Sequence, residues 1–358
     1  MQKQALIVGV SGVIGQALAE QLLGHGWKVY GLSRGRTPIP AGCSPLVADL
    51  TAQDSVIKTL QNITVDCVFF SVWSRQKNEQ ENIRVNGAMV SYVINALGER
   101  LRGRHVALVT GLKHYLGPFD AYGKGAVPMT PFREEQGRQP VDNFYYAQED
   151  AVFAGSAQFG FTWSVHRPHT IIGFAVGNAM NMGQTLAVYA TLCKHNGHPF
   201  VFPGSPQQWH GISDMTDANL LAQQLEWAAT SPAAKNQDFN AVNGDVFRWQ
   251  WMWQQIADYF GIEPAPYPGK AQPLADRMDF APAQWRNIAE RYQLNETDIT
   301  KLVSWWHTDA DLGRPMEVFT DMSKSRKAGF TGYQCTSDAF FRLFDKLKTE
   351  KLIPDSDD

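Results

Sequence analysis

The stretch that decides the fold runs from Ala5 to Gly15 and reads ALIVGVSGVIG. Its first four residues form a short apolar run of the kind that is buried as a strand. The apolar spacing of residues 17–23 predicts a helix directly after it. Glycines at 9, 12 and 15 stand between the two, where they allow a tight turn, a close approach of backbone to a pyrophosphate, and close packing of helix on sheet. This context predicts a dinucleotide-binding loop.

The N–H groups and the positive dipole end of the predicted helix are expected to face the phosphates of the dinucleotide. The expected contacts are Gly9, Ser11, Gly12, Val13, Ile14 and Gly15. The alternative is a tight strand-to-helix turn that binds nothing.

Further apolar runs follow at intervals and predict strands at 28–32, 46–48, 67–70, 105–109 and 162–166. Helical patterns between them cover 52–60, 82–97 and 144–159. Strands that alternate with helices predict an α/β fold, a Rossmann-type doubly wound parallel sheet. We expect a dinucleotide-binding domain over 1–168, with later returns of the chain, and a smaller, mostly helical substrate-binding or lid region over 169–358.

Composition excludes several classes of protein. The 358 residues are 44% hydrophobic and 19% charged, with a net charge of −3, so there is no electrostatic case for nucleic acid or an anionic membrane. Four cysteines lie far apart without a CxxC pair, which predicts no metal site and favours a reducing cytoplasm. The uncharged segment 168–193 contains Asn and Gln, and suits a pocket lining better than a membrane span.

The choice of dinucleotide is expected at the end of the second strand, where an acidic residue would bind the ribose of NAD. This chain has Ser33-Arg34-Gly35-Arg36 instead. Arginine guanidinium groups suit the 2′-phosphate of NADP(H), although a pair of solvated arginines is the alternative. Asp49 and Leu50, at the end of the third strand, are expected near the adenine; a turn-starting role for Asp49 is the competing interpretation.

The usual Tyr-xxx-Lys signature of short-chain dehydrogenases is missing. None of the 11 tyrosines has Lys four residues later, and Tyr145 and Tyr146 are followed at that offset by Glu149 and Asp150. Either catalysis is absent or the lysine comes from another part of the chain.

Five segments resemble the progesterone 5β-reductase and iridoid synthase-like (PRISE) family of short-chain dehydrogenases/reductases. They are spread over nearly the whole chain: 79–82 (EQEN), 109–119 (VTGLKHYLGPF), 143–146 (NFYY), 163–168 (WSVHRP) and 243–247 (NGDVF). The family reduces the C=C bond of α,β-unsaturated carbonyl compounds with NADPH.

The resemblance implies that Lys113 and Tyr145 are catalytic and also contact the cofactor, and that Trp73, Phe119 and Tyr145 contact substrate. Two departures from the family pattern stand out. Val72 precedes Trp73 where the family has a TW pair, and His169-Thr170 follow the Arg-Pro pair where the family often has a small residue and Asn. His114 and His166 are expected to be structural histidines rather than acid–base catalysts.

Three functions are therefore compared. The leading hypothesis is an NADPH-dependent enone reductase acting on a small apolar enone or enal, as a monomer or homodimer. The second is a carbonyl reductase or sugar-nucleotide epimerase on the same fold, and the third is a non-catalytic NADP-sensing protein. The joint presence of Lys113 and Tyr145 disfavours the third, and the displaced lysine argues against the second.

Overall fold

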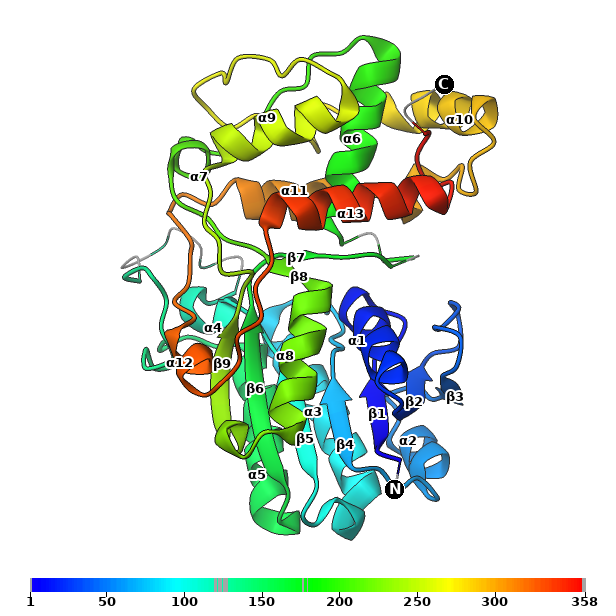
Figure 1. Cartoon of the computed structure of the whole chain (residues 1–358), viewed down its shortest axis with the longest axis vertical. Coiled ribbons are helices and arrows are strands. Elements are labelled where there is room, and N and C mark those ends of the chain that lie inside the picture. The colour runs from blue at the N-terminus through cyan, green and yellow to red at the C-terminus, as the bar shows by residue number, and fades with distance from the viewer. Residues whose placement is uncertain are drawn as a thin grey trace.

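The computed structural model describes residues 2–118, 121, 124, 128–175, 177–178 and 180–355. A parallel sheet with helices on both faces forms one part, and a layer of helices lies across the carboxyl ends of its strands (Figure 1). Among the described residues, no helix combines the length and apolarity needed to cross a bilayer.

Seven strands form the sheet in the order β3-β2-β1-β4-β5-β6-β9, and every neighbouring pair is parallel. Their bounds are β1 Gln4–Val8, β2 Lys28–Ser33, β3 Ser44–Val47, β4 Cys67–Phe70, β5 His105–Val109, β6 Thr162–Pro168 and β9 Gln237–Ala241. The order reverses between β1 and β4, and this is the position at which doubly wound sheets bind their ligands.

Helices cover both faces of the sheet because β1, β4 and β5 are apolar on both sides. One face packs against α1 (Val13–Gly24) and α8 (Ala218–Thr230). The other packs against α2 (Gln53–Leu60), α3 (Glu79–Leu97) and α5 (Phe144–Phe159). The α/β class and the doubly wound parallel sheet expected from the sequence are confirmed.

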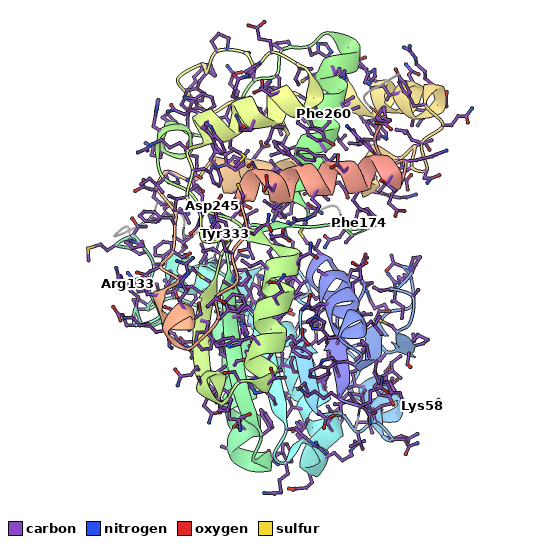
Figure 2. All side chains as sticks on the ribbon, in the orientation of Figure 1. Lys58, Arg133, Phe174, Asp245, Phe260 and Tyr333 are labelled. Carbon is purple, nitrogen blue, oxygen red and sulfur yellow. The ribbon has the colours of Figure 1, made fainter. Side chains whose placement is uncertain are left out.

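The helical layer has its own large apolar core, rich in aromatic side chains. Its helices are α6 Met182–Asn196, α7 Pro206–His210, α9 Trp249–Phe260, α10 Ala281–Arg291, α11 Trp305–Leu312 and α13 Thr336–Thr349. A short parallel pair, β7 (Ile171–Ile172) with β8 (Thr216–Asp217), lies between the layer and the sheet. In Figure 2, Phe260 lies within this layer and Phe174 lies where it meets the sheet.

The remaining short helices are α4 (Lys113–Leu116), α12 (Ser323–Lys327) and the 3₁₀ turns η1 (Gly98–Leu101), η3 (Pro232–Ala234) and η4 (Ile299–Lys301). The chain returns to the sheet through α8, β9 and α12, all of which lie beyond residue 168. Strand β9 was not among the six expected strands, because its residues QDFNA lack an apolar run. The second part of the uncharged segment, residues 182–193, belongs to α6, which is buried inside the helical core.

A chain of buried polar groups crosses the β5–β6 pair. His105 is within 3.0 Å of Ser164 Oγ, which is 2.9 Å from His166 Nε2, and His166 Nδ1 is 2.8 Å from Gln224 Oε1. Burial lowers the pKa of His105 to about 3 and that of His166 to about 4. Both imidazoles are therefore neutral in the folded protein at neutral pH, which suits the expected structural role of His166.

These two histidines should make the fold acid-sensitive. Their pKa values are lower in the folded state than in the unfolded state, so the stabilisation is complete above about pH 6.5 and is lost as the pH falls toward 4. Between pH 7 and pH 5 each should contribute a loss of about 2 kcal/mol in the free energy of unfolding. Urea titrations at both pH values measure this loss. His166→Gln should reduce the difference between them, and an unchanged difference would contradict the assignment.

Candidate active site at the carboxyl ends of the strands

The glycine loop between β1 and α1 is as tight as the sequence predicts. Gly9 has φ +96°, and its N–H donates to Leu32 O at 2.9 Å. A Cβ on Gly15 would lie 2.2 Å from Gly9 O, so only glycine fits the packing of α1 against the strand end. A Cβ on Gly12 would meet only that same oxygen, at 3.4 Å. Gly15 therefore serves packing, whereas Gly12 leaves space in front of the helix.

The N-terminus of α1 is suited to an anion. Gly12 is its N-cap and supplies no side-chain hydrogen bond, and no acidic residue occupies the first turn. In contrast, α3, α5 and α6 are each capped by an asparagine side chain. The first N–H groups of α1, around Val13 and Ile14, thus keep the donors that a pyrophosphate would accept. The loop fits a dinucleotide.

The adenosine end of the expected site lies at the carboxyl ends of β2 and β3. Arg34 and Arg36 are exposed just after β2, which ends at Ser33. Hydrogen bonds from Thr51 lower the pKa of Asp49, and the positive charges of Arg34 and Arg36 contribute less. Asp49 Oδ1 accepts from the Thr51 N–H at 2.9 Å and from its hydroxyl at 2.7 Å.

Asp49 therefore starts a turn, as the competing interpretation expects, and its contact with an adenine stays a prediction. The adjacent Leu50 is buried and belongs to the apolar core. The two arginines remain as the groups that could contact a 2′-phosphate.

Lys113 lies in an aromatic enclosure. Its ammonium nitrogen is 5.1 Å from the ring centre of Trp73, 5.2 Å from that of Phe144 and 6.0 Å from that of Tyr145. The Trp73 and Phe144 rings stack with centroids 5.2 Å apart. Aromatic faces attract a cation and also exclude water from it. Residues from the ends of β4 and β5 and from the start of α5 thus converge on one point.

Burial lowers the pKa of Lys113 to about 8. Among the neighbouring charges, Glu79 and Asp311 raise it, and Arg75 and Arg314 lower it. A buried lysine whose pKa is lowered in this way is typical of functional sites.

The geometry distinguishes Tyr145 from Tyr146. The Tyr146 hydroxyl donates to His114 O at 2.6 Å and accepts from the Gln139 N–H at 2.9 Å, so backbone groups occupy it on both sides. Tyr145 points instead to the strand ends: a Cβ on Gly111 would lie 3.1 Å from its hydroxyl oxygen. The glycine of the TGLKHY segment therefore makes room for the Tyr145 hydroxyl.

Asn143 and Glu79 fix the two catalytic candidates relative to each other. The Asn143 side chain caps α5 by accepting from the Tyr145 N–H at 3.0 Å, and its Nδ2 donates to Lys113 O at 2.7 Å. Glu79 Oε1 accepts from the Phe144 N–H at 2.8 Å. The resemblance included these two residues in its motifs, and the structure gives them this positioning role.

Helix α11 is held above this centre by a buried polar network that the sequence analysis missed. Asp311 accepts from Thr170 Oγ1 at 2.8 Å and from Arg314 at 2.5 Å. Arg314 also donates to His169 Nε2 at 2.6 Å, and His169 Nδ1 lies 2.8 Å from Asp214 Oδ1. His169 and Thr170, which depart from the family pattern, are thus hydrogen-bonded to residues of the distant segment 311–314. Nothing in the sequence pairs these residues.

The other expected residues are placed as follows. His114 is buried beside Glu149 of α5, with its Nδ1 3.4 Å from the Glu149 carboxylate. Phe119 lies outside the described residues. Phe144, which was not singled out, belongs to the enclosure, and the aromatic run of the NFYY segment was the available signal.

Fold and site define a Rossmann-fold protein with a lysine–tyrosine pair. Residues 46–354 match the model of the PRISE-like Rossmann-fold domain, and the chain belongs to this family. It is 38% identical to a 3-oxo-Delta(4,5)-steroid 5-beta-reductase of Arabidopsis thaliana, over 98% of this chain and 93% of the relative. An (S)-8-oxocitronellyl enol synthase of Nepeta cataria is 38% identical over 98% and 93%, and one of Catharanthus roseus is 35% identical over 98% and 92%.

Solved structures show the same fold at low identity. The UDP-glucose 4-epimerase of Thermotoga maritima superposes with a TM-score of 0.69 at 10% identity, covering 97% of this chain and 99% of that one. RMD from Pseudomonas aeruginosa, solved with NADPH, has a TM-score of 0.66 at 13% identity, covering 98% of both chains. These similarities bear on the fold alone.

Proposed function

We propose that this chain is an NADPH-dependent reductase of the C=C bond of α,β-unsaturated carbonyl compounds. The convergence of Lys113 and Tyr145 at the carboxyl end of β5 carries this proposal. The names of the relatives agree with it. A 3-oxo-Delta(4,5)-steroid is a conjugated enone, and position 5 is the carbon β to its carbonyl group. An enol is what a conjugated carbonyl compound becomes after reduction at the β-carbon.

In this mechanism, NADPH when bound supplies the hydride that adds to the β-carbon of the substrate. Negative charge then develops on the carbonyl oxygen of the substrate as an enolate. The Tyr145 hydroxyl donates a hydrogen bond to that oxygen, and this bond strengthens as the charge develops. The Lys113 ammonium adds positive charge nearby, and Trp73 and Phe144 keep water away from it.

The remaining parts of the chain have supporting roles. Residues 1–168, with α8 and β9, provide the dinucleotide site, and the helical layer covers the substrate end. The four cysteines are free thiols, which suits a reducing cytoplasm. We expect the substrate to be a small enone or enal that binds beside Trp73.

Arg34 should set the preference for NADPH over NADH. A charge-assisted hydrogen bond to phosphate contributes on the order of 1.5–3 kcal/mol. Arg34→Ala should therefore raise the KM for NADPH by roughly tenfold or more and leave the KM for NADH nearly unchanged. Steady-state kinetics with both cofactors measure this. Equal losses with the two cofactors would mean that Arg34 acts through the structure instead.

The reaction type is tested by product analysis. The purified protein is incubated with NADPH and a simple cyclic enone, NADPH consumption is followed by absorbance, and the product is identified by mass spectrometry and NMR. A saturated ketone supports the proposal. An allylic alcohol would point to a carbonyl reductase, and no consumption with any enone would favour a non-catalytic NADP-binding protein.

A further inference from the structure

Arg75 stands two residues after Trp73, and its side chain contacts α11. Its guanidinium carbon lies 3.8 Å from the ring centre of Trp306 on α11. Stacking on an indole face fixes the plane of a guanidinium group and leaves its N–H edges pointing outward. The loop after β4 and the helix above the site therefore meet at this contact.

The backbone on both sides of Arg75 is clamped by α3. The Ser74 N–H donates to Asn86 Oδ1 at 2.7 Å, and Asn86 Nδ2 donates back to Ser74 O at 2.9 Å. The Gln76 N–H donates to Asn82 Oδ1 at 2.8 Å. Asn86 is fully buried. Arg75 is thus an exposed side chain on a fixed backbone, and its guanidinium group lies over the ring of Trp306.

Charged groups of both signs act on Lys113, and Arg75 is one of them. After the larger effect of burial, Arg75 lowers the pKa of both Lys113 and His307, so it lies near both. Among the described residues, the acids that act on Lys113 are Glu79 and Asp311, and both also accept other hydrogen bonds. Glu79 accepts from the Phe144 N–H and from Asn82 Nδ2, and Asp311 accepts from Thr170 and Arg314.

Of the described charges that act on Lys113, Arg314 is paired with Asp311, and Glu79 accepts from the neutral donors of Phe144 and Asn82. Within the described ranges of the chain, Arg75 forms no ion pair with an acidic side chain. A planar guanidinium group in this state matches a carboxylate, which it can bind through two parallel N–H···O bonds.

We propose that Arg75, stacked on Trp306, is a specificity-determining residue that binds a carboxylate at the far end of an enone substrate. The preferred substrates are then α,β-unsaturated carbonyl compounds with a carboxylate several bonds from the reacting double bond. This narrows the substrate class of the proposed function and rests on that function. It also revises the expectation of a purely apolar substrate.

The test compares a charged enone with its neutral counterpart. The charged one is a straight-chain methyl enone that carries a carboxylate two methylenes beyond the β-carbon, and the neutral one is its methyl ester. At low ionic strength the wild type should favour the acid by roughly tenfold in kcat/KM. The preference should shrink with added salt, because the contact is at the surface.

Arg75→Gln should remove this preference by raising the KM for the acid roughly tenfold, with kcat/KM for the ester within about twofold of wild type. Arg75→Lys, which keeps the charge but loses the planar fork, should retain part of it. Arg84→Gln is the matched control, because Arg84 is an exposed arginine on α3 that pairs with Glu81. Arg84→Gln should leave kcat/KM unchanged for both the acid and the ester.

Equal losses on acid and ester in Arg75→Gln, or no preference in the wild type, would overturn the inference while leaving the proposed function intact. Binding of the saturated keto acid, followed by tryptophan fluorescence, needs no turnover. Arg75-dependent binding in a protein that consumes no NADPH would overturn the proposed function alone. Absence of both binding and consumption would overturn the two together.

Discussion

Replacing Tyr145 with phenylalanine should lower kcat about 10²- to 10³-fold, the usual loss on removing one donor to a developing oxyanion. The change deletes one hydroxyl at the ends of β5 and β6 and leaves the ring against Phe144. The KM for the enone should change much less, because the hydrogen bond strengthens mainly in the transition state. Steady-state kinetics with a simple enone and saturating NADPH measure the split.

Tyr146→Phe is the matched control, one residue along the same helix. It removes a donor to His114 O and an acceptor for the Gln139 N–H, and both bonds are structural. We expect a loss of about 1–3 kcal/mol in the free energy of unfolding and little change in kcat. If Tyr146→Phe abolished turnover and Tyr145→Phe did not, the catalytic tyrosine would be the second of the pair.

The fold could be predicted where an element depends on residues that are close together in the sequence. The strand and helix of residues 5–23 follow from the spacing of their own apolar residues. The glycines between them are required by contacts within the loop itself. The next five sheet strands, β2 to β6, contain short apolar runs, and their parallel order follows from the crossovers. Strand β9 was missed because three of its five residues are polar, and it is paired only through β6.

The site was only partly predictable. No spacing rule joins Lys113 to Tyr145, since they lie on different elements that Asn143 brings together, and only the family resemblance pointed to the pair. The family prediction is confirmed over most of the chain.

The network through Asp311, Arg314 and His169 could not be predicted at all. Its members are common polar residues from two distant segments, one with His169 and the other with Asp311 and Arg314, and their burial depends on how α11 docks. The same docking brings Arg75 and Trp306 together.

Gly12→Val should abolish NADPH binding and leave the fold intact. Gly12 has φ −82° and ψ 171°, extended backbone that valine adopts readily, and a Cβ there would touch only Gly9 O at 3.4 Å. The branched side chain would stand in front of the α1 N-terminus, where backbone N–H groups must reach a pyrophosphate. Losing two charge-assisted bonds at about 1.5–3 kcal/mol each lowers affinity roughly 10²-fold or more. Fluorescence titration with NADPH and thermal unfolding measure the two properties separately.

Gly15 and Gly24 of α1 serve as controls that separate the effect on NADPH binding from the effect on stability. Gly15→Ala should act in the opposite way, because its Cβ would lie 2.2 Å from Gly9 O and 2.6 Å from Val10 Cα, and backbone cannot move aside cheaply. We expect it to destabilise the fold by about 1–3 kcal/mol, as overpacking does. Gly24→Ala, with nothing within 4 Å of the added carbon, should change neither property. Retained NADPH affinity in Gly12→Val would remove this loop from the cofactor site, and unfolding of that variant would mean that Gly12, like Gly15, serves packing.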